Sequence, residues 1–317
     1  MSEARRVALP LAVTLAVQTL VAFAVYCAPV MAPVAGPALG YSPSAVGYYI
    51  AATYFGSMLS SAAAGGVLAG ALAPLLILAF GWQWGAVAIG AACAALALAI
   101  GAVRERYDRE LDPRAPISLR SAIGPVRMVL AEPPLRLMCI TSFVYGGVQI
   151  TLVTYLVTFL VDSFALTLVV AGLVMAVSQV ASVIGRVLWG GLADRVLTRR
   201  AMLGLLGIGM GISALVALAA SPDWPAWLLF VYAAAFGATA VGWNGVFLAE
   251  VARVAPAGRT SEATGGCLFF TFLGVVVAPP GFNAVLALAG SYPLAYATFA
   301  APALAVGVWL LARMPKP

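Results

Sequence analysis

The chain has 317 residues, of which 63% are hydrophobic and only 9% are charged, with a mean hydropathy of +1.04. Soluble domains carry about 25% charged residues, so this composition excludes a water-soluble fold. The charges are also unevenly placed, because none occurs between Arg6 and Arg104. Such long apolar runs must lie in lipid, and their continuous rather than alternating pattern predicts α-helices instead of barrel strands.

A membrane-spanning helix needs about 20 apolar residues. On that length the sequence predicts ten spans, at 8–34, 44–64, 65–80, 84–103, 136–161, 168–189, 201–220, 226–249, 264–288 and 293–312. The polar segment 104–135 divides them into a first bundle (1–103) and a second, six-helix bundle (136–317). Within this linker, residues 117–130 mix basic and apolar side chains, which fits either a short helix on the membrane surface or a solvated segment.

In the first bundle, residues 44–80 are too many for one membrane span and too few for two. Residues 44–80 as one helix would run roughly 55 Å, whereas the bilayer core is about 30 Å thick. Divided by a turn near Gly65 and Gly66, the second helix would keep about 15 residues, below the usual minimum of roughly 17.

The net charge of +6 comes from clusters at Arg5–Arg6, 104–136, 186–200, 253–259 and near the C-terminus. The intervening connections carry only Asp162 and Asp223. This is the positive-inside pattern, so we expect both termini and the linker on the cytoplasmic side of a bacterial inner (plasma) membrane, and no nucleic-acid partner. The four cysteines lie in apolar stretches, so no disulfide framework is expected.

Histidine is missing from the chain and lysine is nearly so, which limits catalysis and ATP binding. The chain has no histidine, and its only lysine is Lys316. A phosphate-binding P-loop and histidine-based metal or catalytic sets are therefore excluded, and we expect no cofactor and no metal. No Asp or Glu lies near the middle of a predicted span, which leaves the coupling ion open.

The strongest local motif follows the sixth predicted span and contains Gly190, Asp194, Arg195, Arg199 and Arg200. It fits a short turn between two closely packed helices, with Asp194 able to accept hydrogen bonds from helix-end amides or an arginine. A generic basic loop is the alternative.

With this motif the chain resembles the major facilitator superfamily of secondary transporters. That family places G-x-x-x-D-[RK]-x-G-[RK]-[RK] between the second and third helices of each six-helix half, and here 196–198 lack the inner glycine and add one residue. The basic linker, the six spans after it and the Gly81-Trp82-Gln83-Trp84 turn also match. The first-half motif and two helices are missing, which places an internal shortening near 62–70.

Polar side chains within spans are costly in lipid and tend to face a cavity, although bonding between helices is the common alternative. The candidates for the substrate cavity are Gln18, Tyr26, Tyr145, Gln149, Gln179, Trp243, Asn244 and Asn283. Of these, Gln149 and Asn244 are favoured. Pro279–Pro280 predicts a broken or kinked helix beside Asn283.

The resemblance implies an all-α, ten-span (4 + 6) transporter that moves a small solute by alternating access, is not an enzyme, and acts as a monomer in lipid. Two alternatives remain. The first is a shortened member of the same family without transport activity. The second is an integral membrane enzyme, which the absence of histidine disfavours.

The charge pattern yields a topology that labelling can test. Single cysteines placed at 162 and 223 should react with an impermeant reagent added outside, because both positions lie in connections without basic residues. A cysteine at 115 should not react. External labelling at 115 would contradict the span count.

Overall fold

The computed structural model describes residues 119–312, together with scattered positions between 74 and 98, all of which are helical. Gly81, at the turn expected between two spans, has φ 77°, a left-handed conformation that favours glycine. The spans 8–34 and 44–64, the junction near 62–70 and the candidates Gln18 and Tyr26 lie outside the described residues.

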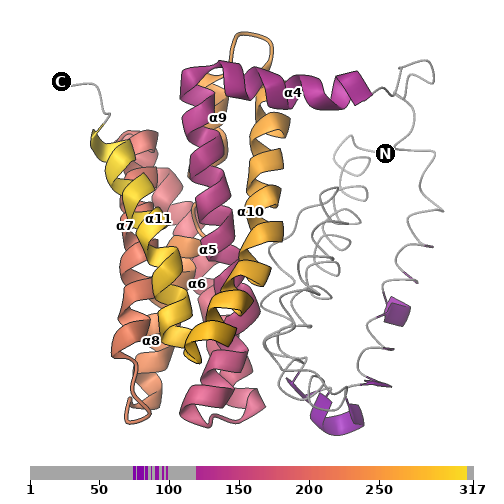
Figure 1. The fold of residues 1–317 in the computed structure, drawn as a ribbon, viewed down its shortest axis with the longest axis vertical. Helices are drawn as coiled ribbons and strands as arrows, with labels where there is room; N and C mark the ends of the chain where they lie inside the picture. The colour runs from indigo at the N-terminus through magenta and orange to yellow at the C-terminus, as the bar shows by residue number, and fades with distance from the viewer. Residues whose placement is uncertain are drawn as a thin grey trace, which may run out of the picture.

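The described chain from 133 onward forms six helical segments that are long and apolar enough to cross a membrane. They are α5 (Pro133–Phe164), α6 (Leu168–Arg195), α7 (Arg199–Val216) with the short 3-10 helix Ala217–Ala219, α8 (Ala226–Ala240) followed by α9 (Asn244–Val254), α10 (Thr260–Ala289) and α11 (Tyr292–Ala312) (Figure 1). The six spans predicted after the linker are therefore confirmed. Most helices extend a few residues beyond their expected ends.

Helix α4 (Leu119–Ala131) precedes the bundle and lies across its end, at the top of Figure 1. Met128 and Val129 are buried, and α4 packs on α10 where Gly266 lies so close that an added Cβ would be 2.5 Å from the Pro125 carbonyl oxygen. Of the two alternatives for residues 117–130, a helix or a solvated segment, the helix is confirmed. One face of α4 packs on the bundle.

Glycines allow the closest helix contacts, as is usual where lipid rather than water surrounds a bundle. The most extensive contacts join α5 with α10, α6 with α8 and α7 with α11. At these contacts Gly274 faces the Phe143 carbonyl and Gly237 faces the Ser178 carbonyl, each too closely to admit a Cβ. The buried small residues thus determine which helices become neighbours.

Two helix interruptions differ from expectation. The span predicted as one helix at 226–249 is divided by a turn at Val241–Trp243, between α8 and α9. Gly242 occupies this turn, where an added Cβ would overlap the carbonyl oxygen of Ala238. At Pro279–Pro280, where a broken or kinked helix was expected, the structure excludes the break, because α10 continues as one helix through both prolines.

Aromatic side chains fill the bundle towards the end away from α4. Tyr155 stacks on Phe282 with ring centroids 4.2 Å apart and donates a 2.7 Å hydrogen bond to the carbonyl of Pro279. Tyr296 lies edge-on to Phe282. At that end, the Tyr292 hydroxyl donates to Asp162 at 2.9 Å and joins α11 to α5.

The glycine contacts predict the effect of adding one methyl group. Gly237→Ala should lower the stability of the bundle by about 1–3 kcal/mol, because the new Cβ overlaps the Ser178 carbonyl and must separate α6 from α8. Thermal melting of the purified protein in detergent would measure the loss. Gly281→Ala is the matched control, since its Cβ would meet nothing within 4 Å. Equal melting temperatures of both variants would contradict the packing role.

Candidate functional site

The loop motif forms the sharp turn between α6 and α7. Helix α6 ends at Arg195 and α7 begins at Arg199, with Thr198 as its N-cap residue. The Thr198 hydroxyl accepts a hydrogen bond from the Ala201 amide at 3.2 Å, which satisfies one of the free N–H groups of the first turn. Thr198 lies in the part of the motif that departs from the family pattern, so a side-chain cap starts α7 here.

Asp194 links the two ends of this turn. Its carboxylate accepts a 2.9 Å ion-paired hydrogen bond from Arg199, and the side chains are 60% and 36% exposed. Arg195 is exposed at the end of α6, and Gly190 has nothing within 4 Å of an added Cβ. Of the motif's members, Asp194 and Arg199 are therefore brought together directly.

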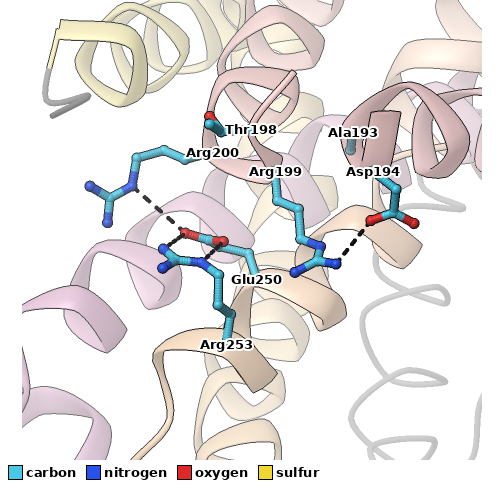
Figure 2. Close-up of a pocket in the computed structure, with 7 residues that line it drawn as sticks. All are labelled: Ala193, Asp194, Thr198, Arg199, Arg200, Glu250 and Arg253. Atoms are coloured by element: carbon cyan, nitrogen blue, oxygen red, sulfur yellow. Dashed lines mark hydrogen bonds and ion pairs between the residues drawn. The ribbon is translucent and has the colours of Figure 1, made fainter. Parts of the chain in front are cut away.

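A second ion pair, with a buried carboxylate, lies beside the first. Glu250 of α9 is only 1% exposed and accepts two 2.7 Å hydrogen bonds from Arg253, while Arg200 lies 3.8 Å from the same carboxylate (Figure 2). Together these groups line a pocket of about 400 Å³ that also includes Ala193 and Thr198. The two ion-pair systems hold the end of α6, the start of α7 and the end of α9 together.

A polar cluster lies deeper, at the turn between α8 and α9. The Gln149 side-chain oxygen accepts hydrogen bonds from the Trp243 indole at 3.0 Å and from the Asn244 amide at 3.2 Å. The Asn244 amide also donates to the Val241 carbonyl at 3.3 Å. Trp243 is fully buried, whereas Gln149 and Asn244 are half-buried. The two residues favoured from the sequence are thus direct hydrogen-bonding partners.

The same helix break leaves carbonyl oxygens of α8 without donors from their own helix. Two side chains of α6 supply them: the Trp189 indole donates to Ala238 at 2.8 Å, and Arg186 Nε lies 3.4 Å from the Val241 oxygen. Arg186 therefore joins the polar cluster through a carbonyl that it shares with Asn244.

Within the described part of the chain the remaining candidates form no hydrogen bond with this cluster, although the Tyr145 ring packs edge-on against Trp243 with centroids 5.6 Å apart. Tyr145 is fully buried and donates a 2.8 Å hydrogen bond to the Leu203 carbonyl of α7. Gln179 is buried against Met175, with its amide nitrogen 3.9 Å from the sulfur. Asn283 lies on α10, and its side-chain oxygen is buried without a hydrogen-bond partner among the residues that the structure describes. A cavity role for these three stays a prediction.

Two contacts of this region were not expected from the sequence, that of Arg186 with Val241 and that of Arg200 with Glu250. Arg186 lay near the expected end of its span at 189, but α6 continues to Arg195 and moves this charge two and a half turns inside the helix. The pairing of Glu250 with Arg253 follows from their spacing, whereas the approach of Arg200 from α7 depends on tertiary packing. For Arg186 the sequence offered one signal, the length of the basic stretch that begins after position 185.

The ion pair of Glu250 generates a stability prediction with a matched control. Glu250→Gln should destabilise the bundle by about 1–3 kcal/mol, because the buried carboxylate loses its charge-assisted hydrogen bonds from Arg253, whose own side chain is 54% exposed. Glu262→Gln removes a pair of the same spacing with Arg259, but that carboxylate is 48% exposed, so the cost should be about 0–1 kcal/mol. Melting temperatures of both variants in detergent would decide. A larger loss for Glu262→Gln would contradict this assignment.

The fold is similar to solved transporter structures. The fucose:proton symporter of E. coli matches with a TM-score of 0.55 and 14% identity, over 96% of this chain and 84% of the symporter. A bacterial homologue of the human lysosomal transporter Spinster, in an inward-facing conformation, has the same TM-score and identity over 98% and 96% of the two chains. A peptide transporter, POT, matches with a TM-score of 0.53 and 14% identity, over 94% of this chain and 85% of the transporter.

A comparison with curated proteins found no match. The family model for the Major Facilitator Superfamily, however, matches residues 52–279, which is more than two thirds of the chain. This match covers the loop motif, the helix break and both ion-pair systems. The six membrane-spanning segments agree with it. The chain is therefore an integral membrane protein of the major facilitator superfamily, a family of secondary transporters and not of enzymes.

Proposed function

We propose that this chain transports a small solute by alternating access, with the solute bound against the polar cluster of Gln149, Trp243 and Asn244. The observation that carries the proposal is the hydrogen-bonded junction of α5 with α9 at a helix break. Discontinuous helices with unsatisfied polar groups near the membrane midplane are a recurring form of substrate site in secondary transporters.

The cluster retains groups that a solute can use. An indole N–H is a donor only, so the Gln149 oxygen must face Trp243 and its amide nitrogen must point elsewhere. Both hydrogens of the Asn244 amide are used, on Gln149 and Val241, which leaves its oxygen as an acceptor. Gln149 and Asn244 can therefore offer one donor group and one acceptor side by side.

The ion pairs at the α4 end support a conformational role. Asp194–Arg199 and Glu250–Arg200–Arg253 connect three helix ends, and breaking charge-assisted bonds of about 1–3 kcal/mol is enough to shift a two-state balance at least fivefold. In our proposal this end faces the cytoplasm of a bacterial inner membrane, the chain acts as a monomer, and 1–103, 104–135 and 136–317 are its first bundle, linker and second bundle.

The inactive alternative keeps one specific observation in its favour. Residues 44–80 are too few for the helices and the loop motif that the family places there, so part of one cavity wall would be missing. A transport assay separates the two candidates, because only the active form accumulates solute.

Asn244→Ala is the variant that tests solute contact. It removes the free oxygen and the two amide hydrogen bonds, but the Gln149 oxygen keeps its bond from Trp243 and the Val241 oxygen keeps its bond from Arg186. The loss of stability should therefore be only about 1 kcal/mol, while uptake falls at least about tenfold. Uptake of radiolabelled sugars, amino acids and short carboxylates by proteoliposomes would measure this. Gln149→Leu is a poorer test, because it leaves the buried Trp243 N–H without an acceptor, at about 1–3 kcal/mol.

Thr239→Ala is the control, since among the described residues the Thr239 hydroxyl bonds only to carbonyls of its own helix, one turn before the break. Normal uptake by Asn244→Ala would show that the cluster only joins the helices. No uptake of any solute by the native chain would instead favour the shortened, inactive form.

A further inference from the structure

We infer that the outer face of α4 and the first turns of α5 together bind an anionic phospholipid. Arg127 and Arg136 hold the phosphate of its headgroup, and Ile123, Leu130 and Ile140 contact its acyl chains. All five side chains are exposed in the described part of the chain. The inference is independent of the proposed transport function, because it concerns the surrounding membrane rather than a solute.

Helix α4 has two different faces. Met128 and Val129 are buried against the bundle, whereas Ile123 and Leu130 are 58% and 42% exposed. Ile123, Arg127 and Leu130 are spaced by four and three residues, so they share the face that is turned away from the bundle. A short helix with apolar and basic side chains outside its packed face is typical of segments that lie in the membrane interface.

The contact with α10 places α4 at the depth of the lipid headgroups. Gly266, against which Pro125 of α4 packs, is six positions after the first residue of α10, or about 9 Å along its axis. Helix α10 has 30 residues and is about 45 Å long, so a centred bilayer core of about 30 Å leaves about 7.5 Å at each end. The contact therefore lies at the boundary of the hydrocarbon core, where α4 crosses the bundle (Figure 1).

The start of α5 continues the same surface. Arg136 and Ile140 are both exposed and four residues apart, so they lie on one face of this helix. They follow its first residue by about 4.5 Å and about 10.5 Å. Because α5 has 32 residues, about 9 Å of it lies outside the bilayer core at each end. Arg136 is therefore among headgroups, and Ile140 is among acyl chains.

Arg127 and Arg136 are available for an anion. Within the residues that the structure describes, neither side chain forms an ion pair or a hydrogen bond. They lie on either side of the corner between α4 and α5, four residues before the end of α4 and three after the start of α5. One phosphate can accept charge-assisted hydrogen bonds from two such guanidinium groups. Glu132, which is exposed at the corner, opposes this attraction.

Two other partners fit parts of this surface. Water would solvate the arginines but leave Ile123 and Leu130 unburied beside lipid. A carboxylate of the linker, which carries four acids between 105 and 112, could pair with Arg127. Neither partner accounts for the apolar side chains exposed on both helices. A phospholipid supplies an anion and acyl chains together, and basic residues beside a membrane span attract anionic lipids.

The test measures lipid preference on the purified full-length chain. Native mass spectrometry during titration with phosphatidylglycerol or phosphatidylcholine gives the dissociation constant of the first bound lipid. The native chain should bind phosphatidylglycerol at least about fivefold more tightly. Arg127→Gln and Arg136→Gln should each reduce this preference by about fivefold, and Glu132→Gln should increase it. Arg259→Gln is the matched control, because it removes the same charge from an exposed arginine that is paired with Glu262.

A second measurement reports the depth of α4 without changing either arginine. A spin label on Ile123→Cys, in a chain whose four native cysteines are replaced by alanine, is studied in nanodiscs that contain phosphatidylglycerol. It should collide more with oxygen, which concentrates in lipid, than with a water-soluble nickel chelate. Asp223→Cys, in an exposed turn, is the control and should show the reverse.

Equal affinity for the two lipids, an unchanged preference in both arginine variants, or an equal loss in Arg259→Gln would overturn the inference. A label at 123 that collides mainly with the nickel chelate would also overturn it. Glycerol 3-phosphate carries the phosphate without acyl chains and should not displace the lipid. Displacement at equal affinity would assign the arginines to a soluble phosphate instead. If the arginine variants do not fold, the two lipids on the native chain and the label at 123 still decide.

Discussion

A helix that is interrupted inside a bilayer leaves carbonyl groups that only the protein can satisfy, since no water is present to do so. In this chain the interruption lies at Val241–Trp243, and the side chains that satisfy it come from two neighbouring helices. Trp189 and Arg186 approach from α6, and Asn244 begins the next helix. The position of these groups determines where α5, α6 and α9 meet, which is the place that we propose for solute binding.

The glycine contacts and the polar break depend on each other. Gly185 lies against Ala238, and Gly237 lies against Ser178, so α6 and α8 are close enough for the Trp189 and Arg186 side chains to reach carbonyls of α8. A larger side chain at Gly237 would separate the helices and lengthen those hydrogen bonds. Dispersion and close packing, which dominate helix association in lipid, thus position the polar groups.

The charges at the α4 end and the polar cluster occupy the two ends of α9. Asn244 begins this helix at the cluster, and Glu250 and Arg253 lie in its last turns, against Arg200. Because α9 has only 11 residues, a displacement at one end must reach the other as a rigid motion. In the proposed mechanism, a solute at Asn244 and the ion pair at Glu250 would be coupled through this single short helix.

The sequence alone determined that the chain lies in a membrane, with six spans after the linker and a loop motif, because apolar length is a local signal. It also singled out Gln149 and Asn244 as rare polar residues within spans, and their role in a solute cavity stays a prediction. The sequence also indicated the family, through the loop motif that contains Gly190, Asp194 and the arginines that follow. Tertiary structure decided that Gln149 bonds to Trp243 and Asn244, that Arg200 joins Glu250, and that Arg186 reaches Val241. These contacts join helices far apart in sequence, and helix ends and interruptions depend on what a neighbouring helix can satisfy. For this reason the break appears at Gly242, while Pro279 and Pro280 lie within an unbroken helix.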